Sequence, residues 1–130
     1  MSKKVKVELE FPIHASPNMI FQYLTTPSGL SGWFADDVNS RGKFYTFIWD
    51  GVEEKAKLAG KKDNEKVKYK WLDDDGKETG TYIEFKIMVD ELTKDVSLLV
   101  TDFCDEDEEE ETRLLWENQI GDLKHIIGAI

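Results

Sequence analysis

The sequence is poor in the residues that form crosslinks, metal sites and phosphate contacts. Its 130 residues include one cysteine, Cys104, so no disulfide can form within the chain, which agrees with a reducing compartment. Neither of the two histidines, His14 and His125, has a second histidine or a cysteine at ligand spacing, so we expect no transition metal and no other cofactor. Only Arg41 and Arg113 are arginines, and 27 acidic against 17 basic residues give a net charge of −10. That charge repels a phosphate backbone and argues against a nucleic-acid partner.

Long apolar runs are absent as well. No stretch approaches the ~20 apolar residues that a bilayer span requires. The first residues, Met-Ser-Lys-Lys-Val-Lys, lead into alternation and not into the apolar region of a signal peptide. Because 40% of the residues are hydrophobic and 34% are charged, the composition is typical of a soluble globular protein. We predict one cytoplasmic domain over residues 1–130, without a membrane span.

The segment 110–130 has the period of an amphipathic helix. Apolar residues recur at spacings of four and three and form one stripe: Trp116, Ile120, Leu123, Ile127 and Ile130. We expect Leu115 and Ile126 to widen this stripe. Gly121 and Gly128 lie beside it, and since a glycine within a helix costs roughly 0.5–1 kcal/mol, both predict close approach of another backbone. The stripe is too short for a coiled coil, so its expected partner is the concave face of a sheet.

Strand and helix signals alternate before that helix. Apolar residues alternate with charged ones over 5–13, which predicts a half-buried strand. Ser16-Pro17 predicts a helix from Pro17 to Leu24 with Met19, Ile20, Tyr23 and Leu24 on its apolar side, and a second short helix spans Pro27 to Phe34. Residues 36–42 form a loop or a ragged edge strand. From Lys43 onward, turn residues separate about five strands.

Two details of those strands are specific. Asp50-Gly51 predicts a two-residue hairpin turn, which would pair Trp49, Phe47 and Tyr45 with Val52, Glu54 and Ala56. In the strand 66–71, valine and aromatic residues alternate with lysines, giving one apolar and one basic face. The whole order, β-α-α-β(5–6)-α, predicts an α+β fold in which a curved antiparallel sheet of six to seven strands wraps around the long C-terminal helix.

Several motifs in this order match a known family. They are IHASPNMIFQYLT (13–25), TPSGLSGWF (26–34), WDG (49–51), YKW (69–71) and a late helix starting near Trp116. They resemble the START-like (SRPBCC) helix-grip superfamily, most closely the branch of the activator of heat-shock protein 90's ATPase, in which Leu30 and Trp33 hold matching positions. Two departures are Arg41-Gly42 in place of the usual Gly-Gly, and a last helix that stops at Ile130, which would shorten one end of a cavity. The resemblance implies a sheet gripping the helix, often around a hydrophobic pocket, but it implies no reaction.

Ten residues are candidates for the lining of such a pocket. They are the aromatic set Trp33, Phe34, Phe47, Trp49, Tyr69, Trp71 and Phe85, together with Asp102, Trp116 and Ile120. The alternative is that the rings fill the core of a small domain, because large rings can plug a cavity as easily as line it. A pocket for an apolar small molecule typically spans roughly 300–1,000 Å³ with few polar groups.

Asp102 and the acidic run each allow two interpretations. If the strand 96–100 continues, its alternation places Asp102 on the inner side, where burial would raise the pKa of the carboxyl. If the strand ends or bulges at Thr101, Asp102 lies in water. The seven carboxylates of 105–111 either complement the dipole of the following helix or dock a basic partner. Consecutive acids do not have the spacing of a calcium loop, so we assign no metal site.

The strand 44–49 is apolar on both faces. Phe44 and Ile48 face one way, whereas Tyr45, Phe47 and Trp49 face the other. A strand of a one-sided sheet should not have this pattern. Either the two short helices cover its second face, or that face contacts a partner or a second copy of the chain.

Three functions remain open from the sequence. The first is non-catalytic binding of an apolar small molecule or lipid between sheet and helix. The alternative is a protein-interaction domain, similar to the co-chaperone branch, that uses its acidic surface and the strand 44–49 against a protein partner or a second copy. A remote alternative is an enzyme of the polyketide-cyclase type with Asp102, His14 or Tyr69 as acid or base. The sequence contains no pair of acid–base groups at a spacing typical of an active site to support the enzyme interpretation, so we assign no catalytic residue.

Overall fold

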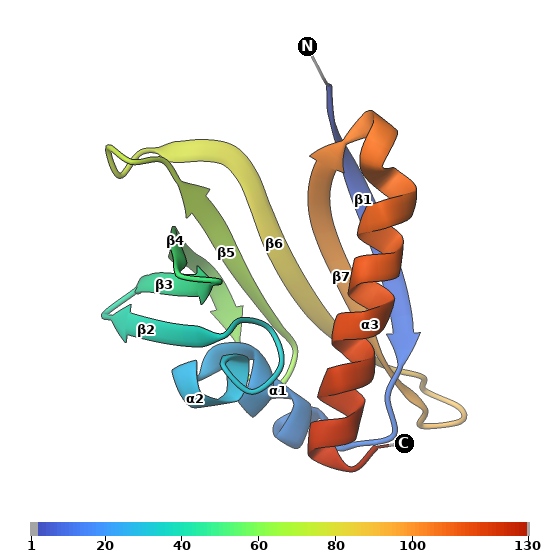
Figure 1. Cartoon of the computed structure of the whole chain (residues 1–130). Coiled ribbons are helices and arrows are strands. Elements are labelled where there is room, and N and C mark those ends of the chain that lie inside the picture. The colour runs from blue at the N-terminus through green and yellow to red at the C-terminus, as the bar shows by residue number, and fades with distance from the viewer. Residues whose placement is uncertain (1–2, 130) are drawn as a thin grey trace.

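The computed structural model describes residues 3–129 as a curved sheet wrapped around a long C-terminal helix (Figure 1). The strands are β1 (Lys4–Pro12), β2 (Asp37–Arg41), β3 (Phe44–Trp49), β4 (Val52–Lys62), β5 (Lys66–Leu72), β6 (Glu78–Val89) and β7 (Val96–Asp105). The helices are α1 (Pro17–Thr25), α2 (Pro27–Leu30), the 3₁₀ turn η1 (Glu106–Glu108) and α3 (Glu109–Ile127). All neighbouring strands are antiparallel, in the order β1-β7-β6-β5-β4-β3-β2. The predicted α+β helix-grip fold is confirmed, with seven strands.

The predicted start of α1 is confirmed, but one side of its apolar face is different. The Ser16 hydroxyl accepts the backbone N–H of Met19 at 3.2 Å and caps the helix, and Pro17 follows at its first turn. The buried residues are Ile20, Phe21 and Leu24, whereas Met19 is 45% exposed. The expectation for Met19 was therefore wrong, because the helix is rotated so that Phe21 enters the core.

The second helix is shorter than predicted. α2 ends at Leu30, and the residues up to Phe34 form turns, in which the backbone N–H groups of Phe34 and Ala35 donate to the Leu30 carbonyl. The segment 36–42 contains β2, which is the edge strand of the sheet. α1 and α2 cross one end of the concave side of the sheet, below the opening between β6 and α3 in Figure 1.

The predicted hairpin register is confirmed. β3 and β4 pair Trp49 with Val52, Phe47 with Glu54 and Tyr45 with Ala56. Both turn residues have positive φ, 49° at Asp50 and 79° at Gly51. This backbone matches the right-handed twist of the strands, and Asp-Gly adopts it at little cost.

The helix α3 buries a narrower stripe than predicted. Trp116, Ile120 and Leu123 are buried, but Leu115 is 55% and Ile126 41% exposed, so neither belongs to the buried face. An added Cβ at Gly121 would meet nothing within 4 Å, and the expected close backbone approach there is wrong. The same expectation is wrong at Gly128, which follows the helix at a φ of 75° and ends it in the left-handed region. The predicted place of Ile130 lies outside the described residues.

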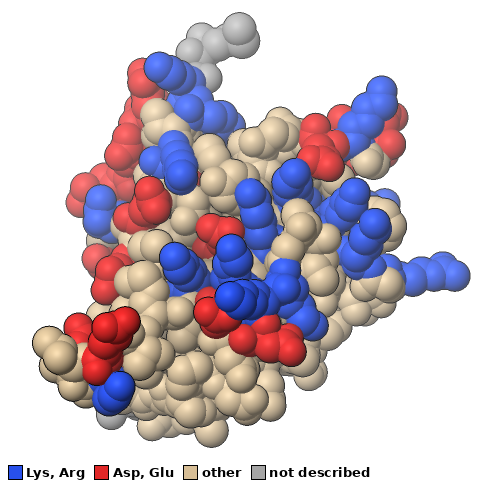
Figure 2. Space-filling model, turned by 180° about the vertical axis from the view of Figure 1, so that it is seen from behind, with Lys and Arg blue, Asp and Glu red and all other residues tan. Residues whose placement is uncertain are grey.

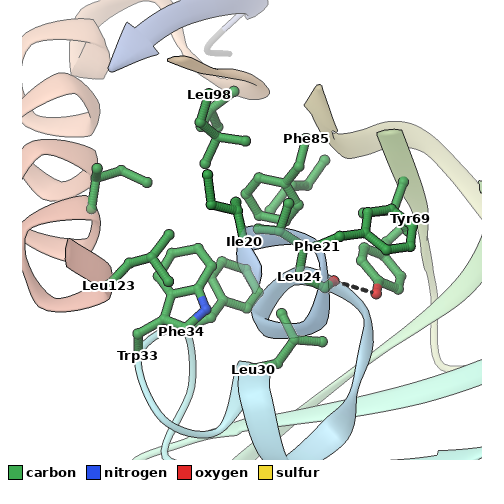
Figure 3. Close-up of a cluster of buried hydrophobic side chains, with 14 of the residues drawn as sticks. Ile20, Phe21, Leu24, Leu30, Trp33, Phe34, Tyr69, Phe85, Leu98 and Leu123 are labelled. Carbon is green, nitrogen blue, oxygen red and sulfur yellow. Dashed lines mark hydrogen bonds between the residues drawn. The ribbon is translucent and has the colours of Figure 1, made fainter. Parts of the chain in front are cut away.

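The core lies where α1, the turns after α2 and α3 meet the inner side of the sheet, and every strand contributes to it. Figure 3 shows a part of this core. Three polar aromatic residues of this core also complete α1. The final carbonyls of a helix have no partner within the helix. Trp33, Tyr69 and Tyr45 donate to the consecutive carbonyls of residues 23–25 at 2.8, 2.7 and 2.9 Å. Strands β3 and β5 are thereby fixed to the end of α1 by hydrogen bonds as well as by packing.

The two short helices do not cover the outer face of β3. The hydroxyl of Tyr45, on the inner face, bonds to α1, so the helices lie on the inner side. Phe44 points to the outer side and is 51% exposed, and Ile48 is half-buried there. The interpretation that α1 and α2 cover this second face is wrong. A partner contact on it stays a prediction.

Candidate functional site

A cleft of about 1060 Å³ lies between the N-terminal half of α3 and the inner side of the sheet. Its walls come from β3 to β7, from Lys4 at the start of β1, from Phe34 in the turns after α2, from the β5–β6 turn and from α3. The apolar part of the wall includes Trp49, Trp71, Ile83, Leu115 and Trp116. The cleft is open to solvent on one side, because α1 and α2 close only the other end of the sheet–helix interface.

The ten sequence candidates divide into two equal groups. Five of them line the cleft: Phe34, Trp49, Trp71, Asp102 and Trp116. The other five lie in the closed core and not on the cleft wall: Trp33, Phe47, Tyr69, Phe85 and Ile120. The interpretation that rings fill the core therefore describes the second group, while contact of the first group with a ligand stays a prediction.

The aromatic rings of the wall hold one another in place. Phe34 stacks on Trp116 with ring centroids 5.8 Å apart, and Trp49 lies 6.4 Å from Trp71. The Phe34 carbonyl accepts the indole N–H of Trp49 at 2.8 Å and the amide N–H of Gln119 at 3.3 Å. This carbonyl ties β3 to α3 across the floor of the cleft. Trp49 and Trp71 are only half-buried, so part of each ring is open to the cleft.

Asp102 is a half-buried carboxyl at the foot of this wall. β7 continues to Asp105 without ending at Thr101, so the interpretation that left Asp102 in water is wrong. One carboxylate oxygen accepts the indole N–H of Trp116 at 2.8 Å, and the other accepts the backbone N–H of Phe103 at 2.7 Å. Burial raises the pKa of the Asp102 carboxyl above its usual value, and these two hydrogen bonds and the charge of Lys4 oppose that shift.

The cleft wall carries more negative than positive groups. The acidic residues are Glu53, Glu54, Asp73, Asp74 and Asp102, and the basic ones are Lys4 and Lys55. The arrangement therefore combines flat aromatic surface with an excess of carboxylates around it. It can hold an apolar body and accept hydrogen bonds from, or pair with, a donating or cationic group.

The comparisons with known proteins agree with this architecture. The family model described as a START-like superfamily domain matches residues 1–129. The chain belongs to the START-like superfamily. Its solved relatives include BfR322 from Bacteroides fragilis, with 33% identity over 98% of this chain and 93% of that one, and a TM-score of 0.66. No curated protein matches the chain significantly.

Other START-like structures share the fold at lower identity. The Aha1 dimer from Colwellia psychrerythraea has 23% identity over 92% of this chain and 93% of that one, with a TM-score of 0.75. DynU16, a protein of the dynemicin biosynthetic locus, has 14% identity over 95% of this chain and 47% of that one, also at 0.75. The resemblance stated from the sequence motifs is confirmed. At these identities the two structures show the fold alone.

The remaining titratable candidates of this START-like chain do not converge on the cleft. His14 is exposed before α1, and Tyr69 is buried in the core, where burial raises the pKa of its hydroxyl. His125 is exposed and lines a second, more open hollow of about 550 Å³ near the end of α3. Cys104 is buried on β7. Of the three acid–base candidates, only Asp102 lines the cleft.

The acidic run surrounds the start of α3. Glu109, Glu110 and Glu111 occupy its first turn, where negative charge complements the helix dipole. Asp105 and Glu108 share a hydrogen bond that lowers the pKa of Asp105 and raises that of Glu108. Together with Asp107 they bring three carboxylates within 4.8 Å of one another. Such groups are common on acidic surfaces and do not by themselves define a metal site.

Sequence reasoning missed three parts of the site. Gln119 lies on the polar side of the α3 pattern, yet its amide bonds to Phe34. The predicted hairpin pairs Glu54 with Phe47 and so places it on the inner side of the sheet, but Glu54 was not among the candidate site residues. Leu115 was expected in the packed stripe and instead borders the cleft.

Across residues 3–129, no helix is long and apolar enough to cross a membrane.

Proposed function

We propose that the chain binds a small molecule with an apolar, ring-like or chain-like body in the cleft between α3 and the sheet, without chemical conversion. The observation that supports this most is the pair of half-buried indoles, Trp49 and Trp71, which expose ring surface to a cleft of about 1060 Å³. Small-molecule pockets of proteins typically span roughly 300–1,000 Å³ and are lined by aromatic side chains. The START-like family commonly binds hydrophobic ligands.

The polar groups of the wall favour one kind of head group. Five acidic residues against two lysines attract a cation and repel an anion. The aromatic rings of the wall also favour a cation over their faces, which is worth about 0.5–2 kcal/mol. We therefore expect a ligand whose apolar body carries an ammonium or another hydrogen-bond donor, with Asp102 among its acceptors.

A matched series of naphthalene probes tests this proposal. The probes are naphthylmethylamine, naphthalenemethanol and naphthoate, which share one ring body and carry a cationic, a neutral and an anionic group. The expected order of affinity is amine, alcohol, carboxylate. Trp71→Ala should weaken the amine by about tenfold, which is about 1.4 kcal/mol. Phe44→Ala removes an exposed ring on the other side of the sheet and is the control.

The same titration reports on Asp102. Since burial raises the pKa of Asp102, protonation begins at a higher pH than for an exposed aspartate and removes a negative charge from the cleft. Affinity for the amine should therefore fall as the pH is lowered, and Asp102→Asn should flatten this dependence. If none of the three probes binds in the millimolar range, or if Trp71→Ala binds like the original chain, the proposal is wrong.

The second interpretation, a protein-interaction domain, stays a prediction with its own test. Its support is the acidic run on η1 and α3, the uncovered Phe44 and the fold shared with the Aha1 dimer. Reversal of the charges of residues 105–111 should weaken capture of a protein partner or of a second copy. An unchanged set of partners would count against it. For the enzyme interpretation, retained turnover in Asp102→Asn would exclude Asp102 as acid or base.

A further inference from the structure

The outer side of three central strands carries a dense group of lysines, called here the lysine face. It comprises Lys57, Lys62, Lys66, Lys68, Lys70 and Lys86. On β5 the buried Val67 and Tyr69 point inward, so the lysines between them point outward. The register of the sheet puts the lysines of β4 and β6 beside them on the same side. Figure 2 shows lysine and arginine side chains gathered on the back of the molecule, with some acidic side chains among them.

The pairing of the strands places several of these lysines directly opposite one another. Lys57 pairs with Lys70 and Lys62 with Lys66 across β4 and β5, and Lys66 pairs with Lys86 across β5 and β6. Directly opposed residues have their Cβ atoms about 4.5–5.5 Å apart, so like charges there destabilise the sheet. The fold therefore holds a local positive charge that opposes its own stability.

Only part of that charge is neutralised within the chain. Lys62 forms an ion pair with Glu65 at 3.1 Å and Lys70 with Glu78 at 3.2 Å. Lys68 lies 4.0 Å from the ring centroid of Tyr82 and pairs across the strands with Glu84. Among the described residues, none forms a salt bridge with Lys57, Lys66 or Lys86.

The lysine face also contrasts with the rest of the chain. It holds six of the 17 basic residues of a chain whose net charge is −10. Beyond the Debye length of about 8 Å at physiological salt, an exposed charge is largely screened. A short anionic ligand that covers only the lysine face is therefore attracted by the lysines. A long polyanion would extend past the lysine face and be repelled by the acidic residues of the rest of the surface. This charge distribution favours a short acidic segment over a nucleic acid.

From these observations we propose that the lysine face binds an acidic polypeptide segment in an extended conformation. Lys66, Lys68 and Lys70 recur every second residue of β5, which is the period of side chains on one side of any extended chain. Alternate carboxylates of a bound segment would therefore match the row. The exposed Phe44 and half-buried Ile48 border the face on β3, and they provide apolar contact beside the charges. Since this surface is opposite the cleft, the proposal stands independently of the small-molecule site.

The test uses the full chain and a fluorescent synthetic peptide in which glutamate alternates with serine or phenylalanine. A peptide with glutamine in place of glutamate is its neutral counterpart. Binding of the acidic peptide should be detectable at about 0.01 M salt and should weaken at about 0.15 M, because the Debye length falls from about 30 Å to about 8 Å. The double variant Lys66→Gln/Lys86→Gln should bind it about three- to tenfold more weakly.

The matched control is Lys94→Gln/Lys124→Gln, which removes the same charge away from the lysine face and should bind as the original chain does. Equal loss in both variants would mean that only the net charge matters, and this would overturn the proposal. Tighter binding of a short DNA duplex or of phosphatidylserine vesicles, lost in the same variant, would also overturn it, as would absence of peptide binding at low salt. Self-association that depends on the lysine face would assign it to a second copy instead.

Stability provides a second readout. Lys66→Gln removes two directly opposed lysine pairs, so its melting temperature at low salt should rise while peptide binding falls. A lowered melting temperature would contradict the claim that the lysine face carries unrelieved repulsion.

Discussion

The two halves of α3 meet the sheet in different ways. The C-terminal half buries Ile120 and Leu123 against a core that α1 and the turns after α2 complete. The N-terminal half exposes Leu115 and borders a cleft whose wall mixes aromatic rings with carboxylates. One helix thus serves as a structural element at one end and as part of a binding surface at the other. The difference comes from α1 and α2, which fill one end of the concave side only.

Alanine substitutions of two leucines of α3, one in each half, should differ most in their effect on the free energy of unfolding. Leu123→Ala leaves a cavity in the closed core and should lower the free energy of unfolding by about 2–5 kcal/mol. Leu115→Ala, in the open half, should change it by no more than about 0.5 kcal/mol. Urea denaturation of both variants measures the two values. Equal losses would mean that the helix is packed alike along its length.

Removal of one hydroxyl tests the hydrogen bonds at the end of α1. Tyr69→Phe keeps the ring but leaves the Leu24 carbonyl without its donor in a buried site, so it should cost about 1–3 kcal/mol. Tyr82→Phe, on the outer side of β6, is the control and should be nearly neutral. If Tyr69→Phe is neutral as well, the hydrogen bond from Tyr69 to the Leu24 carbonyl does not stabilise the fold, because water can take its place.

The smallest expected change concerns Gly121. It lies within α3 with open space around its Cα, so Gly121→Ala should raise the free energy of unfolding by about 0.5–1 kcal/mol. Thermal unfolding detects this as a higher melting temperature. A loss of stability would indicate a close neighbour at this position.

The parts of the fold that depend on local rules could be predicted from the sequence. Asp50-Gly51 determines a turn type, and the turn determines the register of β3 and β4, so that pairing was correct in every residue. Alternation in residues 66–71 likewise predicted one apolar and one basic face. The lysine face could not be predicted, because it requires the order of three strands in the sheet.

The candidate site was predictable only in part, for a similar reason. Whether an aromatic residue lines the cleft or fills the core depends on where α1 and α2 cross the sheet, which no periodicity encodes. Trp33 and Tyr69 belong to the core, where they donate to carbonyls of α1 that lie 10 and 45 residues earlier in the sequence. The parity of β7 placed Asp102 inward, but only the donor from Trp116 explains why the strand can continue with a half-buried carboxylate.

The four tryptophans allow one direct measurement of ligand binding in the cleft. Trp49, Trp71 and Trp116 line it, whereas the indole N–H of Trp33 is bonded to the Tyr23 carbonyl in the core. In a proton–nitrogen NMR titration with naphthylmethylamine, we predict that the indole signals of Trp71, Trp49 and Trp116 shift progressively while that of Trp33 stays in place. Indole signals that do not move, or a Trp33 signal that moves as much as the others, would contradict binding in the cleft.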